Sequence, residues 1–294
     1  MQTLDQRIKK DLTERFYGKP IEGATILHDL ASFSTKGLPG YYCGNRDAQT
    51  VFVQLNPGIN ADLADAKWDF DTKYFNRDSV ESFIRDYKNS IKDGAKNDRM
   101  RFDAFDVKQA AFLYNWPNSG INFPKIDWTP KTDKDKYIKT VAWLEAKEIV
   151  LREKLQLELV PYASNVFTIN DDHLNLLQPY IETILDEIFR VERTYVIFGS
   201  SIFEELFKLY NQEHHDTFVD LTSKQSVPLK NIKKKDGSAW TTQLNYKVIG
   251  INYNGKKQKA LIAHTFPKQN LGIAFNVMQK YGKKCWEAFN KASF

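Results

Sequence analysis

Two polar side chains, Asn56 and His264, stand where apolar segments of the chain end. Asn56 follows the run Val51-Phe-Val-Gln-Leu and leads into Pro57-Gly58, whereas His264 follows the run Ala260-Leu-Ile-Ala. If both runs are neighbouring parallel strands, the two side chains meet at the carboxyl edge of the sheet, where open α/β sheets bind ligands. The sequence therefore predicts that Asn56 and His264 form a catalytic pair at this edge.

The segments between this pair alternate between helical and strand patterns. Apolar runs at 155–160 and 194–198 predict two further strands, and helical patterns cover 133–154, 172–189 and 202–210. Strands that are apolar on both faces are typical of a parallel sheet covered by helices on each side. We therefore expect a three-layer α/β/α fold with a central, mainly parallel sheet of about four core strands.

Patterns outside this core predict the remaining elements. Helices are expected over 4–17 and 78–91, and Asn254-Gly255 predicts a tight hairpin between strands at 245–253 and 257–264. The last core strand thus gains an antiparallel partner. A closing helix over 270–281 is expected to end at Gly282 as a glycine C-cap. The segments at about 60–130 and 212–240 are interpreted as long insertions in a single domain that spans residues 1–294.

Basic charge is concentrated in the last quarter of the chain. Residues 224–294 contain 14 lysines against Asp236 and Glu287, a net of +12, so residues 1–223 carry −7 of the formal net charge of +5. The densest cluster consists of Lys230, Lys233, Lys234 and Lys235. Such a cluster suits the phosphates of a nucleic acid. A solvated lysine-rich loop is the other interpretation.

Other patterns argue against several classes of protein. The chain has no apolar run of signal-peptide length at its start and none that reaches the roughly 18 residues of a membrane span, so a cytoplasmic protein without a membrane partner is expected. We also expect a monomer. Cys43 and Cys285 predict free thiols, and His214-His215 lacks a third metal ligand nearby. Because no phosphate-binding glycine loop is present, no nucleotide cofactor is expected.

With its elements in this order, the chain resembles the uracil-DNA glycosylase superfamily over residues 51–281. The first motif of the mismatch-specific and single-strand-selective branches, Gly-(Ile/Met)-Asn-Pro-Gly, is similar to Gln54-Leu-Asn-Pro-Gly58. A family strand that ends in Leu-Trp-Gly-Ser is similar to Ile197-Phe-Gly-Ser200, and the second motif, His-Pro-Ser-Pro, to His264-Thr-Phe-Pro267. The order of these landmarks is more specific than any one of them.

The resemblance implies a monofunctional DNA glycosylase that hydrolyses the N-glycosidic bond of uracil or another modified base. Asn56 would hold the attacking water, and His264 would donate a hydrogen bond to the base oxygen that gains negative charge. The residues implied to form the base pocket are Pro57, Gly58, Ile59, Trp68, Phe70 and Glu158, and those implied to contact DNA are Gly199, Ser200, Lys230, Lys233, Lys234, Lys235, Phe266 and Lys268.

Two positions depart from the family pattern. Glu158 stands where the family reads uracil with an asparagine; an amide both donates and accepts, whereas an ionised carboxylate only accepts. A match at Glu158 would therefore require a protonated carboxyl or a base rich in donors, and an exposed glutamate at the edge of the strand is the other interpretation. After His264, Thr265-Phe266 replaces Pro-Ser, and Phe266 or Leu271 would be the wedge that enters the DNA.

Several interpretations stay open. Trp68 and Phe70 can each be a core aromatic instead of the stacking partner of a flipped base. The chain can also be a glycosylase-like fold that binds nucleic acid or a nucleobase without cleaving it. A third possibility is an unrelated α/β hydrolase in which Asn56 and His264 never meet.

Overall fold

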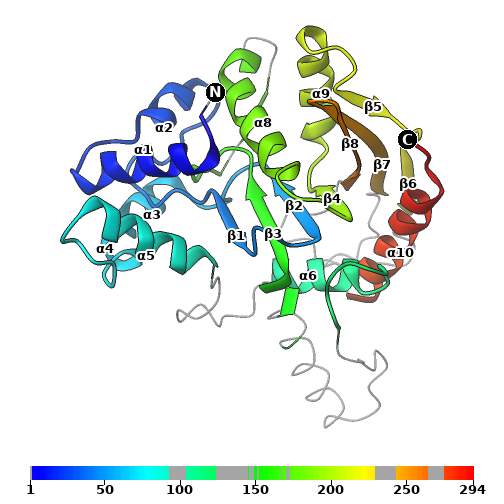
Figure 1. Ribbon diagram of the computed structural model, residues 1–294, viewed down its shortest axis with the longest axis horizontal. Coiled ribbons are helices and arrows are strands. Elements are labelled where there is room, and N and C mark those ends of the chain that lie inside the picture. Colours follow the sequence, from blue (N-terminus) through cyan, green and yellow to red (C-terminus); the bar gives the residue numbers. More distant parts are fainter. Residues whose placement is uncertain are drawn as a thin grey trace, which may run out of the picture.

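The computed structural model describes residues 2–92, 104–123, 145, 149–150, 152–165, 167–169, 173–228, 243–263 and 275–294. They form a mixed α/β fold in which helices pack against one sheet of parallel and antiparallel strands (Figure 1). The strands are β1 (Tyr42–Gly44), β2 (Thr50–Gln54), β3 (Lys154–Glu158), β4 (Tyr195–Phe198), β5 (Phe218–Asp220), β6 (Gln225–Pro228), β7 (Gln243–Tyr253) and β8 (Lys256–Ala263). The helices are α1 (Leu4–Phe16), α2 (Glu22–Ile26), the 3-10 turn η1 (Leu27–Asp29), α3 (Ala61–Ala66), α4 (Trp68–Asp71), α5 (Val80–Lys92), α6 (Ala104–Leu113), α8 (Leu174–Ile188), α9 (Ile202–Glu213) and α10 (Phe275–Lys291).

The strand order in the sheet is β1-β3-β2-β4-β8-β7-β5, and β6 also pairs with β7. Strands β3, β2, β4 and β8 run parallel to one another. They are the four core strands expected from the sequence, and β7 is the antiparallel hairpin partner of β8. Asn254 and Gly255 have φ angles of 50° and 74°, which is the left-handed conformation that a two-residue hairpin turn requires.

The strands that precede Asn56 and His264 are parallel, as predicted. They are not neighbours, which corrects the prediction that they pair directly. β4 lies between β2 and β8 because the chain pairs β3 with one side of β2 and then returns to its other side. The register nevertheless places the two strand ends at one level, since Val53 pairs with Phe198 and Phe198 with Ile262. His264 itself lies just outside the described residues, which end here at Ala263.

Alternate residues of the core strands belong to two separate hydrophobic clusters. Val53 and Phe198 are in a cluster that includes buried residues of α1, α8 and α9. Phe52 and Ile197 are in a second cluster, which includes residues of α6 and α10. Because successive side chains of a strand point to opposite faces, each cluster covers one face of the sheet.

The segment 212–240 is more than the inserted loop that we predicted. Its described part contains β5 and β6, which extend the sheet by pairing antiparallel with β7. Strands of three and four residues carry too little pattern to be recognised alone, and β7 supplies the partner that defines them. The predicted helix at 133–154 falls mostly outside the described residues.

The closing helix does not end at Gly282, which corrects the predicted C-cap. α10 continues to Lys291, and Gly282 lies where it crosses α6. A Cβ atom on Gly282 would lie 1.9 Å from the carbonyl oxygen of Phe112, and the Trp116 indole donates a hydrogen bond to the Gly282 carbonyl at 2.9 Å. This glycine permits close helix packing and does not terminate the helix.

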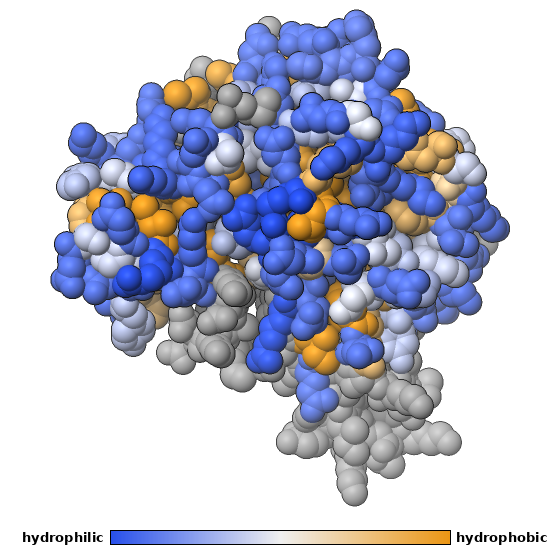
Figure 2. Space-filling model, viewed as in Figure 1, coloured by the Kyte–Doolittle hydropathy of each residue, from blue (hydrophilic) through white to orange (hydrophobic). Residues whose placement is uncertain are grey.

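The surface seen in Figure 2 is mostly hydrophilic, with apolar residues in small separate groups. Within the described part of the chain, no helix has both the length and the apolar character needed to cross a membrane. Several large apolar side chains after the first motif are exposed: Ile59, Leu63, Phe70 and Tyr74.

Candidate functional site

The candidate site lies at the carboxyl ends of β2 and β4. From β2 the chain connects to β3 on one side, and from β3 it crosses back to β4 on the other. Such a reversal of strand order opens a crevice beyond the strand ends, and ligands of open α/β sheets bind there. The Gly199 amide donates to the Val53 carbonyl at 2.9 Å, so the turn after β4 lies directly beside the end of β2.

Asn56 is held at this edge by its amide nitrogen. Nδ2 donates to the carbonyl oxygens of Pro57 (3.2 Å), Tyr162 (3.4 Å) and Ser164 (3.2 Å), and to Ser164 Oγ (3.1 Å). Because carbonyl oxygens only accept, this surrounding fixes which end of the amide is the nitrogen. Oδ1 accepts no hydrogen bond from any residue that the structure describes, so it is available as an acceptor.

The residues after Asn56 form a tight turn. The Pro57 carbonyl accepts from the amides of Ile59 (3.0 Å) and Ser164 (3.1 Å), which ties the turn to the segment after β3. Gly58 is exposed, and a Cβ atom there would meet nothing within 4 Å. Ile59 is exposed as well. The open side of Gly58 leaves room for a ligand beside the turn.

Glu158 is a buried side chain at the end of β3, which excludes the exposed-edge interpretation of this residue. It is 9% exposed. Gln156 Nε2 donates to Glu158 Oε1 at 2.8 Å, whereas Oε2 has no hydrogen-bond partner in the described structure. Burial raises the pKa of Glu158 to about 8, against the hydrogen bond from Gln156 and the charge of Lys154, which lower the pKa. Glu158 is therefore mainly protonated at neutral pH.

Gln54 is a second buried polar residue at this edge, and sequence reasoning missed it. It is the register partner of Glu158 on the neighbouring strand, so both side chains point to the same face of the sheet. Its amide lies over Gly199, where a Cβ atom would be only 2.3 Å from Gln54 Oε1. Nε2 is buried without a partner among the described residues. The signal was present in the sequence as one polar residue within an apolar strand.

Glu158 belongs to a row of polar side chains that we call the polar ladder. The ladder consists of Glu158, Gln156 and Lys154 on β3 and of Gln109 on α6. Lys154 is fully buried, and its ammonium donates to Gln109 Oε1 and to Gln156 Oε1 (3.1 Å). Gln109 Nε2 also donates to Gln156 Oε1 (3.3 Å). The ladder thus connects α6 in the interior with the edge of the sheet.

The two aromatic residues predicted to stack on a base lie in different environments. Trp68 is a core residue, 8% exposed, with its ring centre 5.7 Å from that of Phe83 and the Arg15 guanidinium 4.6 Å away. Phe70 is 61% exposed, and Lys73 Nζ lies 4.3 Å from its ring centre. Phe70 is thus the more exposed of the two rings.

The positions predicted to contact DNA are only partly described. Gly199 and Ser200 are buried, and Ser200 Oγ accepts from the Ile202 amide at 3.3 Å, which supports the start of α9. Residues outside the described part of the chain are His264, Lys230, Lys233, Lys234, Lys235, Phe266 and Lys268. Pro228 and Gln243 flank the lysine cluster in the sequence and pair with each other. Gln243 lies three residues before Tyr246 on β7, and Tyr246 pairs with Ala263 at the carboxyl end of β8. The described residues on either side of this stretch therefore lie at the same edge as Asn56.

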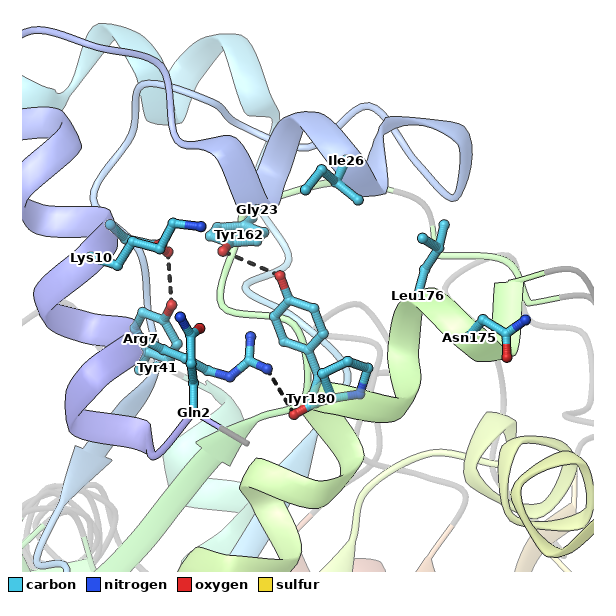
Figure 3. A pocket seen from close by; sticks show the side chains of 12 residues that line it. Gln2, Arg7, Lys10, Gly23, Ile26, Tyr41, Tyr162, Asn175, Leu176 and Tyr180 are labelled. Atoms are coloured by element: carbon cyan, nitrogen blue, oxygen red, sulfur yellow. Dashed lines mark hydrogen bonds between the residues drawn. The ribbon is translucent and has the colours of Figure 1, made fainter. Parts of the chain in front are cut away.

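A cavity of about 380 Å³ adjoins this site between α1, α2 and α8 (Figure 3). Within it, the Tyr162 and Tyr180 hydroxyls are 3.4 Å apart, and Tyr41 donates to Asp11 Oδ2 at 2.7 Å. Arg7 lies 4.5 Å from the Tyr180 ring centre and donates to the Pro179 carbonyl at 3.0 Å. Tyr162 also belongs to the segment that holds Asn56, so one segment forms part of both regions.

The cavity contains a carboxyl group with an altered pKa. Burial raises the pKa of Asp11 to about 6, against the hydrogen bonds from Tyr41 and Tyr162, which lower it. A Cβ atom on Gly23 would lie 2.1 Å from the Tyr162 hydroxyl, so only glycine lets α2 approach these tyrosines. No periodic or motif signal in the sequence predicts this cluster, because its members come from five separate segments.

No group of His, Cys, Asp or Glu side chains in the described ranges is arranged to hold a metal ion. Neither Cys43 nor Cys285 forms a disulfide, as predicted. His214 stacks on Tyr210 and shares a hydrogen bond of 2.8 Å with Gln178. These contacts give His214 a packing role.

Searches of this chain against known relatives return nothing: no protein-family model matches it, and no curated protein matches it. The resemblance to uracil-DNA glycosylases therefore rests on the motifs in the sequence. The function has to be inferred from the geometry at the sheet edge.

Proposed function

We propose that this protein is a DNA glycosylase-like hydrolase that cleaves the N-glycosidic bond of uracil or another modified base at the carboxyl edge of β2 and β4. We also infer a single three-layer α/β/α domain, because each face of the sheet has its own helix-lined cluster. The observation that carries the proposed function is Asn56, whose nitrogen is bound to backbone carbonyls and whose oxygen is left to accept.

Asn56 suits the role of positioning a nucleophilic water. In the reaction, the water oxygen forms a bond to the sugar C1′, the C1′–N bond breaks with its electron pair leaving on the base, and the water proton passes to solvent. Oδ1 would accept a hydrogen bond from this water and aim its oxygen at C1′. An amide does not take up the proton, so Asn56 contributes orientation and not general base catalysis. His264 would stabilise the charge on the departing base.

Gln54 and Glu158 suit recognition of the base. Both are buried at the end of their strands, and each has a polar atom without a partner in the described structure. Orphaned polar atoms cost free energy unless a ligand or water satisfies them. A protonated Glu158 can donate and accept as an amide does, which removes the chemical objection to a glutamate at this position.

Surface features of the segment that follows the first motif suit a nucleic-acid ligand. Phe70 and Tyr74 are exposed aromatic rings on either side of Lys73, whose Nζ lies 4.3 and 4.7 Å from their centres. Exposed rings stack on bases of single-stranded or opened DNA, and lysines neutralise phosphates. The cluster of Lys230, Lys233, Lys234 and Lys235 would add to this attraction because its flanking strands end at the same edge.

The test is cleavage of oligonucleotides that each carry uracil or another modified base, read as alkali-labile sites. Asn56→Ala and His264→Ala are expected to lower the cleavage rate by roughly 100-fold or more, the usual contribution of a positioned group of this kind. Asn290→Ala and His215→Ala are matched controls, because both residues are exposed and lie outside the site. Cleavage that survives the first two substitutions would refute the mechanism.

The second candidate is a protein that binds a nucleobase or nucleic acid without cleaving it. Asn56 favours this candidate because an amide, unlike a carboxylate, cannot take a proton from the attacking water. Glu158 is bound by Gln156 and therefore does not replace such a carboxylate as a free base. Binding that weakens steeply with salt, together with no cleavage of any modified oligonucleotide, would support this candidate.

A further inference from the structure

The cavity between α1, α2 and α8 takes no part in the proposed reaction. Its volume of about 380 Å³ is within the range of small-molecule sites, roughly 300 to 1,000 Å³. Gln2, Ile26 and Asn175 line it and are exposed, so the cavity opens to solvent among them (Figure 3). A small molecule in solution therefore has access to the tyrosine hydroxyls and charged groups inside.

Arg7 is a cation that the fold holds in place within this cavity. Its Nε donates to Thr183 Oγ1 at 2.8 Å, its Nη2 donates to the Pro179 carbonyl at 3.0 Å, and its guanidinium lies 4.5 Å from the Tyr180 ring centre. Nη1 forms no hydrogen bond with any residue that the structure describes. Because the guanidinium is already fixed, it loses little conformational entropy when it binds an anionic group such as a carboxylate.

Asp11 supplies a negative charge one helical turn further along α1. Tyr41 donates to its Oδ2 at 2.7 Å, and Tyr162 also forms a hydrogen bond with it. A carboxylate has about four acceptor sites, so two phenols leave sites for a ligand. Asp11 is mainly ionised at pH 7.5, because its pKa is about 6. Lys10 does not neutralise it directly, since its ammonium group is bound to Glu22 at 2.6 Å.

The two charges face one cavity, but they bind different elements. Residues four apart share one face of a helix, yet Arg7 is turned towards α8 and Asp11 towards Tyr41. A ligand with only an anionic group would be repelled by Asp11, and one with only a cationic group would be repelled by Arg7. A ligand that carries both charges on a short frame satisfies both residues.

Apolar side chains form another part of the cavity. Ile26, Leu176 and Pro179 line it together with the Tyr180 ring. Small-molecule sites commonly combine such a lining with a few polar groups that fix the orientation of the ligand. The ligand should therefore have an apolar part in addition to its two charged groups.

We propose that this cavity binds a free α-amino acid with an apolar or aromatic side chain, whose carboxylate pairs with Arg7 and whose ammonium group pairs with Asp11. The tyrosine hydroxyls around Asp11 add hydrogen bonds to the ammonium group, and Ile26, Leu176 and Pro179 contact the side chain of the ligand.

The direct test is calorimetric titration of the intact protein at pH 7.5 with L-phenylalanine, L-leucine and two analogues that each lack one charged group. 3-Phenylpropionate leaves Asp11 without a partner and 2-phenylethylamine leaves Arg7 without one, so each is expected to bind at least about tenfold more weakly than phenylalanine. Glycine is expected to bind more weakly by a similar factor, because it buries no apolar side chain. Equal affinity of phenylalanine and any one of these three compounds, or failure of both L-amino acids to bind, would overturn the inference.

Substitution of each charged residue assigns the two ends of the ligand. Arg7→Gln is expected to weaken binding of phenylalanine about tenfold without weakening that of 2-phenylethylamine, which has no carboxylate. Asp11→Asn should likewise weaken binding of phenylalanine but not that of 3-phenylpropionate. Equal losses for phenylalanine and the analogue would contradict these assignments. Lys9→Gln, at an exposed position on the same helix, is the matched control and should bind like the native chain.

A third variant tests the location of the site without changing a charge. Ile26 is 52% exposed, so Ile26→Trp is expected to block the cavity and prevent binding of phenylalanine with little effect on stability. Unchanged affinity in this variant would place the ligand elsewhere and refute the site. These titrations contain no DNA, so their result is independent of whether the carboxyl edge cleaves oligonucleotides.

Discussion

At the scale of single residues, two carboxyl groups in different regions of the protein, those of Glu158 and Asp11, are buried and form no ion pair within the described part of the chain. Glu158 accepts from an amide and Asp11 from a tyrosine hydroxyl. Neither hydrogen bond offsets the cost of removing a negative charge from water, so the pKa of each group is raised, to about 8 and about 6. Ionisation of either residue is therefore expected to change the free energy of unfolding with pH.

Glu158→Gln is expected to make the folded protein more stable at alkaline pH. The pKa of Glu158 rises from 4.5 in the unfolded chain to about 8 in the folded chain, so the folded state keeps a proton that the unfolded state has lost. The free energy of unfolding of the native chain therefore falls between pH 4.5 and 8. The substitution removes this loss, which is worth a few kcal/mol at about 1.4 kcal/mol per pH unit.

The measurement is urea unfolding of both proteins at pH 5 and pH 9. Glu205→Gln serves as the control, because an exposed carboxyl group contributes little to this dependence. An identical pH dependence of unfolding in the native chain and in Glu158→Gln would show that Glu158 is not protonated in the folded state.

At the scale of elements, close approach of backbones positions the helices around the sheet. α10 crosses α6 at Gly282, whose carbonyl also binds the indole of Trp116. α6 carries Gln109, the first member of the polar ladder. The crossing of these two helices therefore supports the residues that orient Glu158.

Gly282→Ala is expected to destabilise the fold despite the higher helix propensity of alanine. The added Cβ atom would lie 1.9 Å from the Phe112 carbonyl oxygen, so the helices have to separate. Overpacking of this kind costs about 1–3 kcal/mol, which exceeds the roughly 1 kcal/mol gained in propensity. Gly58→Ala is the control for stability, because a Cβ atom there has open space. Equal unfolding midpoints for the two variants would disprove the close approach.

At the scale of the whole molecule, two described lysines of the basic quarter lie at the edge of the sheet opposite to Asn56. Phe52 on β2 and Leu261 on β8 are at the same level, because both pair with Ile197 on β4. Lys256 and Lys257 lie five and four residues before Leu261, at the amino edge of the sheet. Asn56 lies four residues after Phe52, at the carboxyl edge. At 3.3 Å per residue, Lys256 and Asn56 are roughly 30 Å apart along the strands. The cluster at 230–235 is flanked instead by strand ends at the carboxyl edge.

This difference in position predicts which lysines contribute to binding of single-stranded DNA. Replacing Lys233 and Lys234 with glutamine is expected to reduce the slope of log K against log salt by about 1.4, or roughly 0.7 for each lost phosphate contact. The same change at Lys256 and Lys257 should leave the slope nearly unchanged, because they lie at the far edge. Fluorescence anisotropy across a salt series measures both slopes. Equal reductions in the two double variants would contradict a site at the carboxyl edge.

The sequence by itself determined the local elements and the motif residues of the site. The apolar runs predicted the four parallel strands, and Asn254-Gly255 predicted the hairpin. Asn56 was proposed as a site residue from its place after a strand, and Glu158 from the family resemblance. These features depend on residues close together in the sequence, and periodicity and turn chemistry report such local relations.

Only the tertiary structure decided how these elements meet. It placed β4 between β2 and β8, turned Gly282 from an expected cap into a helix contact, and brought Gln54 beside Glu158 above the buried Lys154. The cavity around Asp11 likewise draws on segments far apart in the chain. Strand order and burial depend on long-range packing, and they alone determine that Glu158 is removed from water and holds its proton.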